Sequence, residues 1–127
     1  MEANANALNW FDIPVQDYDR SQAFYEQIFN MKMIVMEMGE MKTVAFPIDP
    51  ESGKVAGGLN KEEGNSPSTN GTRVYLNANP SIQTVLDRVE SAGGKIIMPK
   101  VELPGGHGFM ALIADTEGNT VGLHANA

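Results

Sequence analysis

The feature that most constrains the fold of this chain is an internal duplication. Each half shows the pattern of one strand, one helix and three further strands, and the copies are offset by about 61 to 64 residues. The matching pieces are IPV with LNA, FYEQIF with VLDRVE, and AGGLN with TVGLH. A unit of this length that occurs only twice is not a solenoid repeat. We therefore expect each module to need its twin to bury its sheet.

The duplication predicts one domain over residues 1–127. Module one covers about 8–60 and module two about 72–125. Between them, 61–71 (KEEGNSPSTNG) is rich in Gly, Ser and Asn, which is typical of a linker.

Hydrophobic periodicity predicts one helix in each module. In module one, Asp17 is the expected N-cap of a helix over roughly 18–30. In module two, Asn79 is the expected cap and Pro80 the first helical residue. The expected strands lie at 8–15, in a hairpin that turns at 39–40, near 53–60, at 72–78, and in three segments between 95 and 125.

Composition excludes several classes of function. The net charge of −7 disfavours phosphate backbones, so we expect no nucleic-acid partner. The absence of cysteine excludes disulfides, thiolate nucleophiles and Cys-type zinc sites, and it fits a reducing compartment. No apolar run is long enough for a membrane span, and the first residues do not resemble a signal peptide. We therefore expect a cytoplasmic protein.

The last predicted hairpin has two largely apolar faces. Strand alternation places Met110, Gly122 and His124 on one face with Leu112, Ala114 and Thr120, and the other face is expected to pack on a helix. Gly58 and Gly122 stand in mid-strand, where they leave room for a ligand or for a close backbone.

Three stretches resemble the vicinal oxygen chelate superfamily, the group of glyoxalases, bleomycin resistance proteins and extradiol dioxygenases. They are FDIPVQDYDRSQAFYEQIF, the segment from VYLN through VLDRVESAGGKII, and DTEGNTVGLH. The resemblance covers about 8–125. It implies an α+β fold in which two βαβββ modules form an open, cupped mixed sheet, and it implies that the protein is a homodimer.

The resemblance also implies a divalent metal in the cup of the family's enzymes, held by His, Glu or Gln from the first and last strands of each module. Carried over one at a time, these positions fall on Trp10, on Gly58, on Arg73 (or Val74 in a register shifted by one), and on Gly122. None of these residues is a usual metal ligand. We therefore expect no metal cofactor and no glyoxalase or dioxygenase chemistry by the family mechanism.

Other side chains on the same strand faces are the candidate ligand-binding residues. They are Trp10, Asp12, Arg73, Tyr75, His107, Met110 and His124. Trp10 offers a flat surface for stacking and Arg73 a grip for an anionic or carbonyl group, while Asp12 and His124 are the candidate catalytic acid/base pair.

Structural interpretations of the same residues remain open. Trp10 and Tyr75 also suit core packing, and Asp12 with Arg73 also suits an ion pair that replaces the metal. His107, in the glycine-rich PGGHGF, belongs either to the rim of the cup or to a solvated, mobile loop. His107 and His124 without supporting carboxylates make a poor metal pair.

Five methionines between residues 31 and 41 are the other unusual feature: Met31, Met33, Met36, Met38 and Met41. Because thioethers adapt to irregular shapes, they suit the wall of a small-molecule pocket, a dimer contact or ordinary core filling.

Three functions follow from these observations. The leading one is a metal-free protein that sequesters or senses a small organic ligand. The alternative is a glyoxalase-like lyase or isomerase, either with displaced metal ligands or metal-free with Asp12 and His124. The third is a structural subunit whose cup is filled by Trp10, Arg73 and Tyr75.

Overall fold

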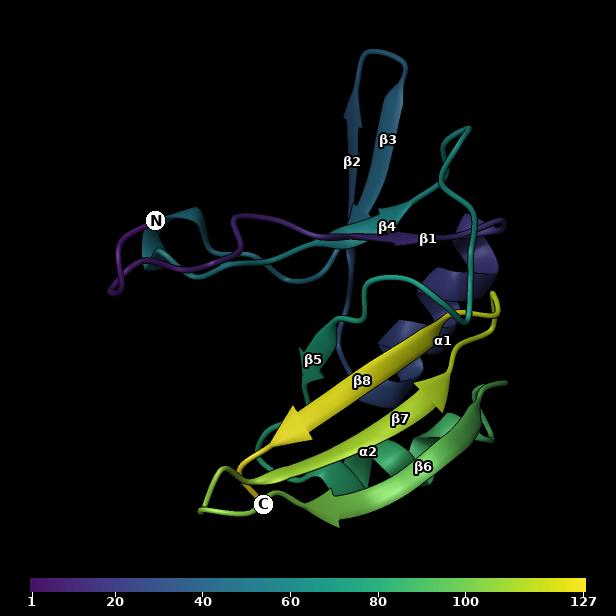
Figure 1. The fold of residues 1–127 in the computed structure, drawn as a ribbon. Helices are drawn as coiled ribbons and strands as arrows, with labels where there is room; N and C mark the ends of the chain where they lie inside the picture. Colours follow the sequence, from purple (N-terminus) through teal and green to yellow (C-terminus); the bar gives the residue numbers. More distant parts are fainter.

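The computed structural model describes residues 1–127 and contains eight strands and two α-helices (Figure 1). In chain order the elements are β1 (Asp12–Pro14), α1 (Tyr18–Phe29), β2 (Ile34–Met38), β3 (Met41–Ala45), the 3₁₀ turn η1 (Pro50–Ser52), β4 (Gly58–Asn60), β5 (Tyr75–Asn77), α2 (Ile82–Val89), β6 (Lys95–Glu102), β7 (Phe109–Ala114) and β8 (Thr120–Ala125).

The strands form two four-stranded mixed sheets with the same topology. The first has the order β1-β4-β3-β2 and the second β5-β8-β7-β6. In each sheet the first strand pairs in parallel with the last strand of its module, and the other pairs are antiparallel. The predicted α+β fold of two βαβββ modules is confirmed.

Strand register aligns the two modules residue by residue. Asp12 pairs with Gly58 in the first sheet, and Tyr75 pairs with Gly122 in the second. The next pair in the first sheet, Ile13 with Leu59, corresponds to the pair Leu76 with Leu123 in the second sheet. Because Asp12 corresponds to Tyr75, the residue two positions before each of them also corresponds, so Trp10 is equivalent to Arg73.

Capping side chains define where the helices begin. The carboxylate of Asp17 accepts a hydrogen bond from the Arg20 amide, which confirms it as the N-cap of α1. The predicted start of α2 was wrong, because Ser81 is the cap and its hydroxyl accepts from Thr84. The side-chain oxygen of Asn79 instead accepts from the Asn126 amide near the end of the chain.

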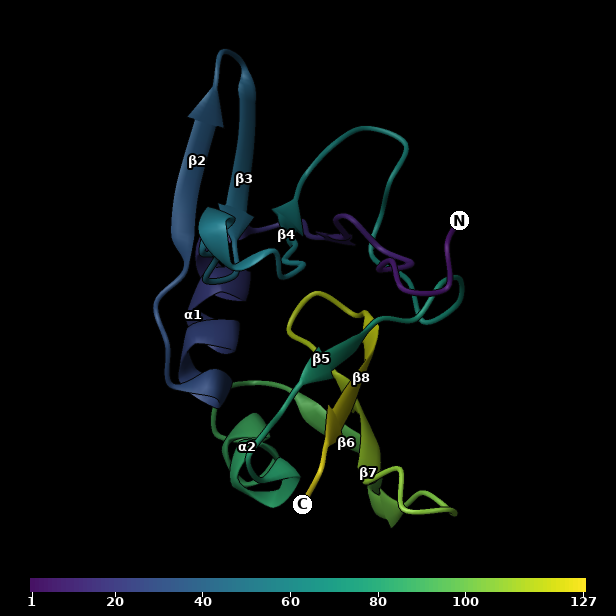
Figure 2. The same ribbon diagram turned by 90° about the vertical axis from the view of Figure 1, so that its left-hand side faces the viewer.

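The first strand of each module is shorter than its sequence pattern indicates. The strands expected over 8–15 and 72–78 are reduced to β1 and β5, which have three residues each. Each of them pairs in parallel with three residues of one partner strand, β4 or β8, so its hydrogen bonding to the sheet extends over three residues. The β2–β3 hairpin turns at residues 39–40 as predicted and extends away from the rest of the molecule (Figures 1 and 2).

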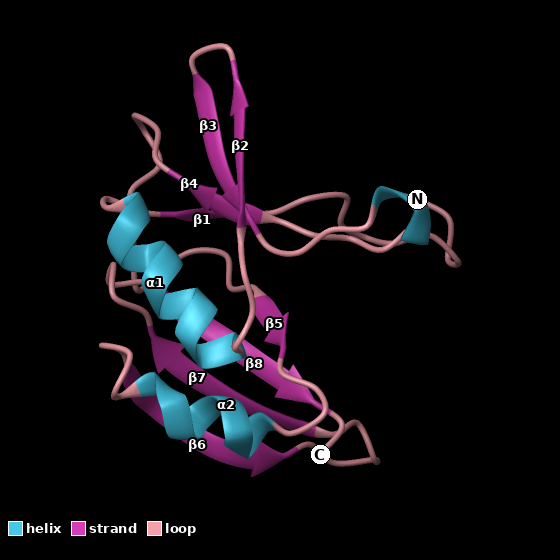
Figure 3. Ribbon diagram, turned by 180° about the vertical axis from the view of Figure 1, so that it is seen from behind, coloured by secondary structure: helices cyan, strands magenta, loops and turns pink.

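Both modules contribute to one hydrophobic core. The two helices contact each other, and α2 also covers one face of β6, β7 and β8 (Figure 3). The largest fully buried side chains come from both halves of the chain: Tyr25, Phe24, Ile28, Leu59, Ile82, Leu86, Ile113 and Leu123. Each sheet is covered mainly by the helix of its own module, and the contact between α1 and α2 joins the two halves of the core.

The turn between β7 and β8, with the sequence DTEGN, connects module two to the start of α1. Glu117 accepts hydrogen bonds from the backbone amides of Gln16 and Asp17, at 2.8 Å each. It also forms an ion pair with the Arg20 guanidinium, with 2.7 Å between Nε and Oε2. Burial by itself raises the pKa of Glu117, but these hydrogen bonds outweigh it and lower the pKa to about 2.

Candidate functional site

Each sheet has an open face, turned away from the helices, and these two faces carry most of the candidate residues. The open face of the first sheet is defined by the paired positions Asp12, Ile34, Met36, Met38, Met41, Thr43, Ala45, Gly58 and Asn60. The open face of the second sheet is defined by Tyr75, Asn77, Met110, Leu112, Ala114, Thr120, Gly122 and His124. The alternation predicted for the last hairpin is confirmed.

On the first sheet the structure brings Trp10 and Asp12 together. The indole Nε1 donates a hydrogen bond to Asp12 Oδ1 at 3.0 Å. Both residues lie on the wall of a cavity of about 330 Å³. The residues that line it are Trp10, Asp12, Met36, Met38, Met41, Thr43 and Asn60. This volume is within the range of small-molecule sites.

The methionines divide between the core and this cavity. Met33 is buried, and Met31 packs against the core from a half-buried position. Met38 and Met41 are 56% and 61% exposed and face the cavity. Core filling therefore explains Met33, and the pocket-wall interpretation applies to Met36, Met38 and Met41, while Met31 lines a separate apolar cavity.

Asp12 and Arg73 do not form the ion pair that the sequence left open. The one ion pair in the chain joins Arg20 and Glu117. Arg73 is exposed just before β5. Tyr75 is not a core residue either, since it is 47% exposed and its ring lies over Gly122.

On the second sheet the structure brings the two histidines together, but through a backbone atom. His124 Nε2 lies 2.7 Å from the carbonyl oxygen of His107. Because a carbonyl only accepts, Nε2 carries the proton in this contact and Nδ1 is the ring nitrogen left free. Met110 pairs directly with His124 across β7 and β8. The loop that holds His107 is thereby tied to β8, while the His107 side chain itself is exposed.

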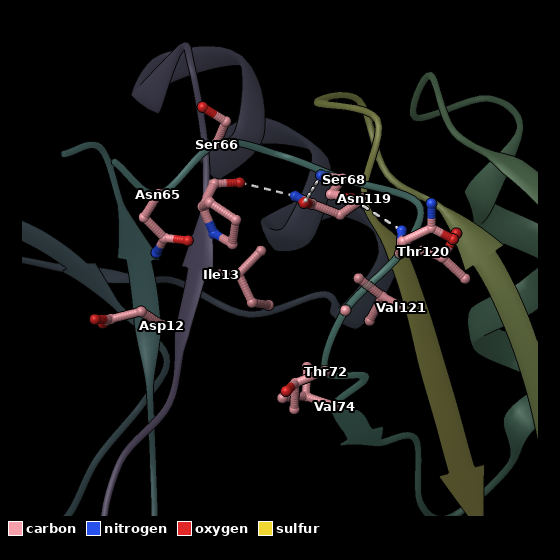
Figure 4. A pocket seen from close by; sticks show the side chains of 13 residues that line it. Asp12, Ile13, Asn65, Ser66, Ser68, Thr72, Val74, Asn119, Thr120 and Val121 are labelled. Carbon is pink, nitrogen blue, oxygen red and sulfur yellow. Dashed lines mark hydrogen bonds between the residues drawn. The ribbon is translucent and has the colours of Figure 1, made fainter. Parts of the chain in front are cut away.

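The structure does not bring Asp12 and His124 into direct contact. They lie on different sheets, and no hydrogen bond joins them. Figure 4 shows the Asp12 side chain pointing away from Thr120 and Val121 at the start of β8. No group of three or more His, Asp or Glu side chains in the chain gathers closely enough to hold a metal ion.

The space beside the two mid-strand glycines is already taken by protein atoms. A Cβ atom at Gly58 would lie 2.6 Å from Thr43 Cγ2 and 2.9 Å from the Val44 carbonyl oxygen. A Cβ atom at Gly122 would lie 2.6 Å from Cε1 of the Tyr75 ring. Of the two explanations that the sequence left open, close approach of the protein's own atoms accounts for both glycines.

A second cavity, of about 270 Å³, lies in the seam between the modules (Figure 4). Ile13 on β1 and Val121 on β8 lie on opposite sides of it. The linker supplies amide and hydroxyl groups, among them Asn65, Ser66 and Ser68. Sequence reasoning treated this segment only as a linker. The Asn, Ser and Thr residues of the linker were the only feature of the sequence that indicated a polar wall for this cavity.

A third cavity, of about 530 Å³, is mainly apolar and also joins the modules. Phe11, Phe29 and Phe46 contribute their rings to it, and Tyr75 closes it from module two. The aromatic residues of module one were the only sequence signal for this site. None of the three cavities described includes Arg73, His107, Met110 or His124.

Solved structures share this fold at low sequence identity. A glyoxalase I mutant from Zea mays matches with a TM-score of 0.69 and 24% identity over 92% of this chain. This chain spans only 46% of the maize chain. The fosfomycin resistance protein FosX from Listeria monocytogenes matches with a TM-score of 0.63 and 18% identity, over 94% of this chain and 93% of that one.

A glyoxalase/bleomycin resistance protein/dioxygenase family enzyme from Burkholderia phytofirmans matches with a TM-score of 0.65 and 15% identity, over 94% and 98% of the two chains. No curated protein matches the sequence. Neither helix has the length and apolarity needed to cross a bilayer.

The family model for the Glyoxalase/Bleomycin resistance protein/Dioxygenase superfamily matches residues 7–123, nearly the whole chain. The protein therefore belongs to this superfamily.

Proposed function

We propose that this protein binds a small organic molecule, and that it does so without the divalent metal that the resemblance implies for the family's enzymes. The observation that carries the proposal is the identity of the four residues at the family's ligand positions. Gly58 and Gly122 have no side chain, the Trp10 indole N–H only donates, and the Arg73 guanidinium has no free lone pair. Such a set supplies no donor atom for Zn, Ni, Mn or Fe.

The register of the strands supports this assignment of positions. Gly58 and Gly122 occupy the same place in the two modules, opposite Asp12 and Tyr75. Trp10 and Arg73 are then equivalent positions in the two modules. This equivalence favours Arg73 over Val74 as the residue at the metal-ligand position in the first strand of module two. The Tyr75 ring occupies the space that a side chain at position 122 would need.

The cavity beside Trp10 and Asp12 supports binding over a purely structural role. A structural subunit would have the site filled by its own side chains. Here the cavity of about 330 Å³ remains open on the first sheet, with Trp10 on its wall. The indole offers a flat apolar surface on which a ligand can stack.

The proposal does not extend to catalysis by Asp12 and His124. These groups lie on separate sheets of one chain, and no hydrogen bond joins them. His124 Nε2 is also engaged by the His107 carbonyl.

We further propose that the protein works as a cytoplasmic homodimer. The exposed apolar side chains on the two open faces that lie outside the cavity beside Trp10, among them Ile34 and Tyr75, are the surfaces that a second copy would cover. Sedimentation velocity over a range of concentrations tests this, and a monomer at all concentrations would contradict it.

Metal analysis of freshly purified protein, combined with native mass spectrometry, tests the main proposal. We expect substoichiometric Zn, Ni, Mn and Fe, together with a co-purifying organic molecule or saturable binding of one from a compound library. A tightly held metal at one equivalent per chain would refute the metal-free site. The absence of any bound compound across the library would refute the binding function.

A further inference from the structure

We propose that the cavity on the open face of the first sheet takes an organic cation, with its charged nitrogen against the face of the Trp10 indole and beside the carboxylate oxygen of Asp12 that the indole leaves free. This inference rests on the proposed function and specifies its ligand class. The proposed ligand has the opposite charge to the one expected from the sequence, which predicted that Arg73 binds an anionic or carbonyl group.

The first argument is the charge of the open face. Among the paired positions of this face, Asp12 is the only ionisable side chain. The neighbouring charged residues of the hairpin, Glu37 and Lys42, pair with each other on the opposite face. Lys42 is further held there by Tyr18, with 4.7 Å between its Nζ and the ring centroid. The cavity therefore presents one negative charge and no positive charge.

The second argument is that Asp12 has no cation of its own. Its one side-chain hydrogen bond comes from the Trp10 indole, a neutral donor. The only ion pair of the chain lies elsewhere, between Arg20 and Glu117. A carboxylate that accepts one neutral hydrogen bond retains lone pairs for a charged partner.

The third argument is the chemistry of the surrounding wall. Trp is the best aromatic partner for a cation, and the hydrogen bond to Asp12 fixes the indole beside the carboxylate. Met36, Met38 and Met41 add polarisable thioethers that adapt to the apolar part of a ligand. An aromatic face, one carboxylate and an apolar wall together favour a quaternary or protonated amine on an apolar body. The net charge of −7 favours its approach.

The single tryptophan provides the readout, because Trp10 lies on the wall of this cavity. The probes are benzyltrimethylammonium, the neutral benzyl alcohol and the anionic phenylacetate, which share one ring and differ in charge. We expect saturable fluorescence quenching by the cation, with an affinity about tenfold above that of the other two probes.

Two matched variants assign the effect to Asp12. Asp12→Asn removes the charge but keeps an oxygen that accepts from the indole, so Trp10 stays in place and the preference for the cation is expected to disappear. Glu37→Gln removes the same charge from the opposite face of the sheet and is expected to leave the preference intact.

Several results would overturn the inference. Phenylacetate binding at least as tightly as the cation would reverse the ligand charge while leaving small-molecule binding in place. An unchanged preference in Asp12→Asn, or no saturable quenching by any probe, would remove the Trp10–Asp12 site as a cation site. If Asp12→Asn instead weakens self-association and leaves probe binding unchanged, the partner of Asp12 is a second copy of this chain. The metal-free binding function is decided separately, by metal analysis and native mass spectrometry.

Discussion

The hydroxyl of Tyr25 donates a hydrogen bond to the carboxylate of Asp115, with 2.8 Å between Oη and Oδ2. The two residues are 90 positions apart, one in α1 of module one and the other at the end of β7 in module two. Both are buried, and burial and the negative charge of Asp115 raise the pKa of Tyr25 well above its ordinary value. The phenol is therefore held as a proton donor to the carboxylate, and this contact joins the modules inside the core.

Tyr25→Phe removes this donor and leaves the rest of the ring packing in place. Asp115 keeps hydrogen bonds from the amides of Glu117 and Asn119 but loses one partner in a buried setting. We expect a loss of about 1.5–3 kcal/mol in the free energy of unfolding, because a hydrogen bond to a charged group is removed. Urea denaturation followed by circular dichroism measures the change.

Tyr75→Phe is the matched control, since it deletes the same atom from an exposed ring whose hydroxyl makes no hydrogen bond. We expect no measurable loss there. Equal losses in the two variants would show that the contact between Tyr25 and Asp115 contributes nothing specific.

Glu117 predicts a pH dependence of stability. Its pKa is about 2 in the folded protein and is expected near the ordinary 4.5 when unfolded. Because the folded pKa is the lower one, the contribution is present above about pH 4.5 and is lost as the pH falls toward about 2. Its size is about 1–3 kcal/mol after allowing for solvent screening at the half-exposed Arg20.

Glu117→Gln tests this dependence. The variant keeps an oxygen for the amides of Gln16 and Asp17 but loses the charge that Arg20 holds. We expect the stability difference from the wild type to be largest near neutral pH and to shrink between about pH 4.5 and 2. Glu40→Gln, in the exposed β2–β3 turn, is the charge-matched control. A difference that stays constant over this range would contradict the prediction.

Asn119 predicts a strong effect of an isosteric substitution. Its side-chain nitrogen donates to the Pro14 carbonyl at 2.8 Å and to Asp115 Oδ2 at 2.9 Å. Asn119→Asp replaces the donating nitrogen with a carboxylate oxygen. This oxygen then faces the Pro14 carbonyl oxygen and the charged carboxylate of Asp115, and neither can donate a hydrogen bond to it. We expect a loss of about 2–4 kcal/mol at neutral pH, with partial recovery in acid as the new carboxylate is protonated.

Thermal and urea unfolding at neutral and acidic pH measure this effect. Asn70→Asp, in the exposed linker, adds the same charge where the Asn side chain makes no hydrogen bond. A loss of similar size in both variants would point to net charge rather than to the contacts of Asn119.

The two mid-strand glycines predict unequal costs for the same substitution. At Gly58 an added Cβ meets backbone, the Val44 carbonyl oxygen at 2.9 Å and Ala45 Cα at 3.2 Å, and these atoms cannot move separately from the sheet. At Gly122 the nearest atoms belong to the Tyr75 ring, a half-exposed side chain that can shift where the backbone at Gly58 cannot. We expect Gly58→Ala to cost about 2–3 kcal/mol and Gly122→Ala about 1 kcal/mol or less.

A double variant checks the reason for the lower cost. Tyr75→Ala combined with Gly122→Ala is expected to cost less than the sum of the two single variants, because the first change removes the obstacle that the second one meets. Strict additivity would show that the ring does not oppose the added methyl group.

Sequence pattern by itself determined the duplication, the βαβββ order of each module and the alternating faces of the last hairpin. These depend on local periodicity and on turn residues, which act over a few positions. The Asp17 cap is likewise local. The cap at Ser81 was missed because Asn79 and Ser81 both suit a helix start, and the contact that holds Asn79 comes from Asn126 near the other end of the chain.

Tertiary structure alone decided how the candidate site is divided. Residue type and strand face indicated that Trp10, Asp12, Arg73 and His124 share one cup. The fold instead places Trp10 and Asp12 on one sheet and His124 on the other, and it leaves Asp12 without an ion-pair partner. Distances between residues of different modules depend on how the two sheets pack through their helices. That packing follows from long-range contacts such as Tyr25 with Asp115, which no local pattern in the sequence encodes.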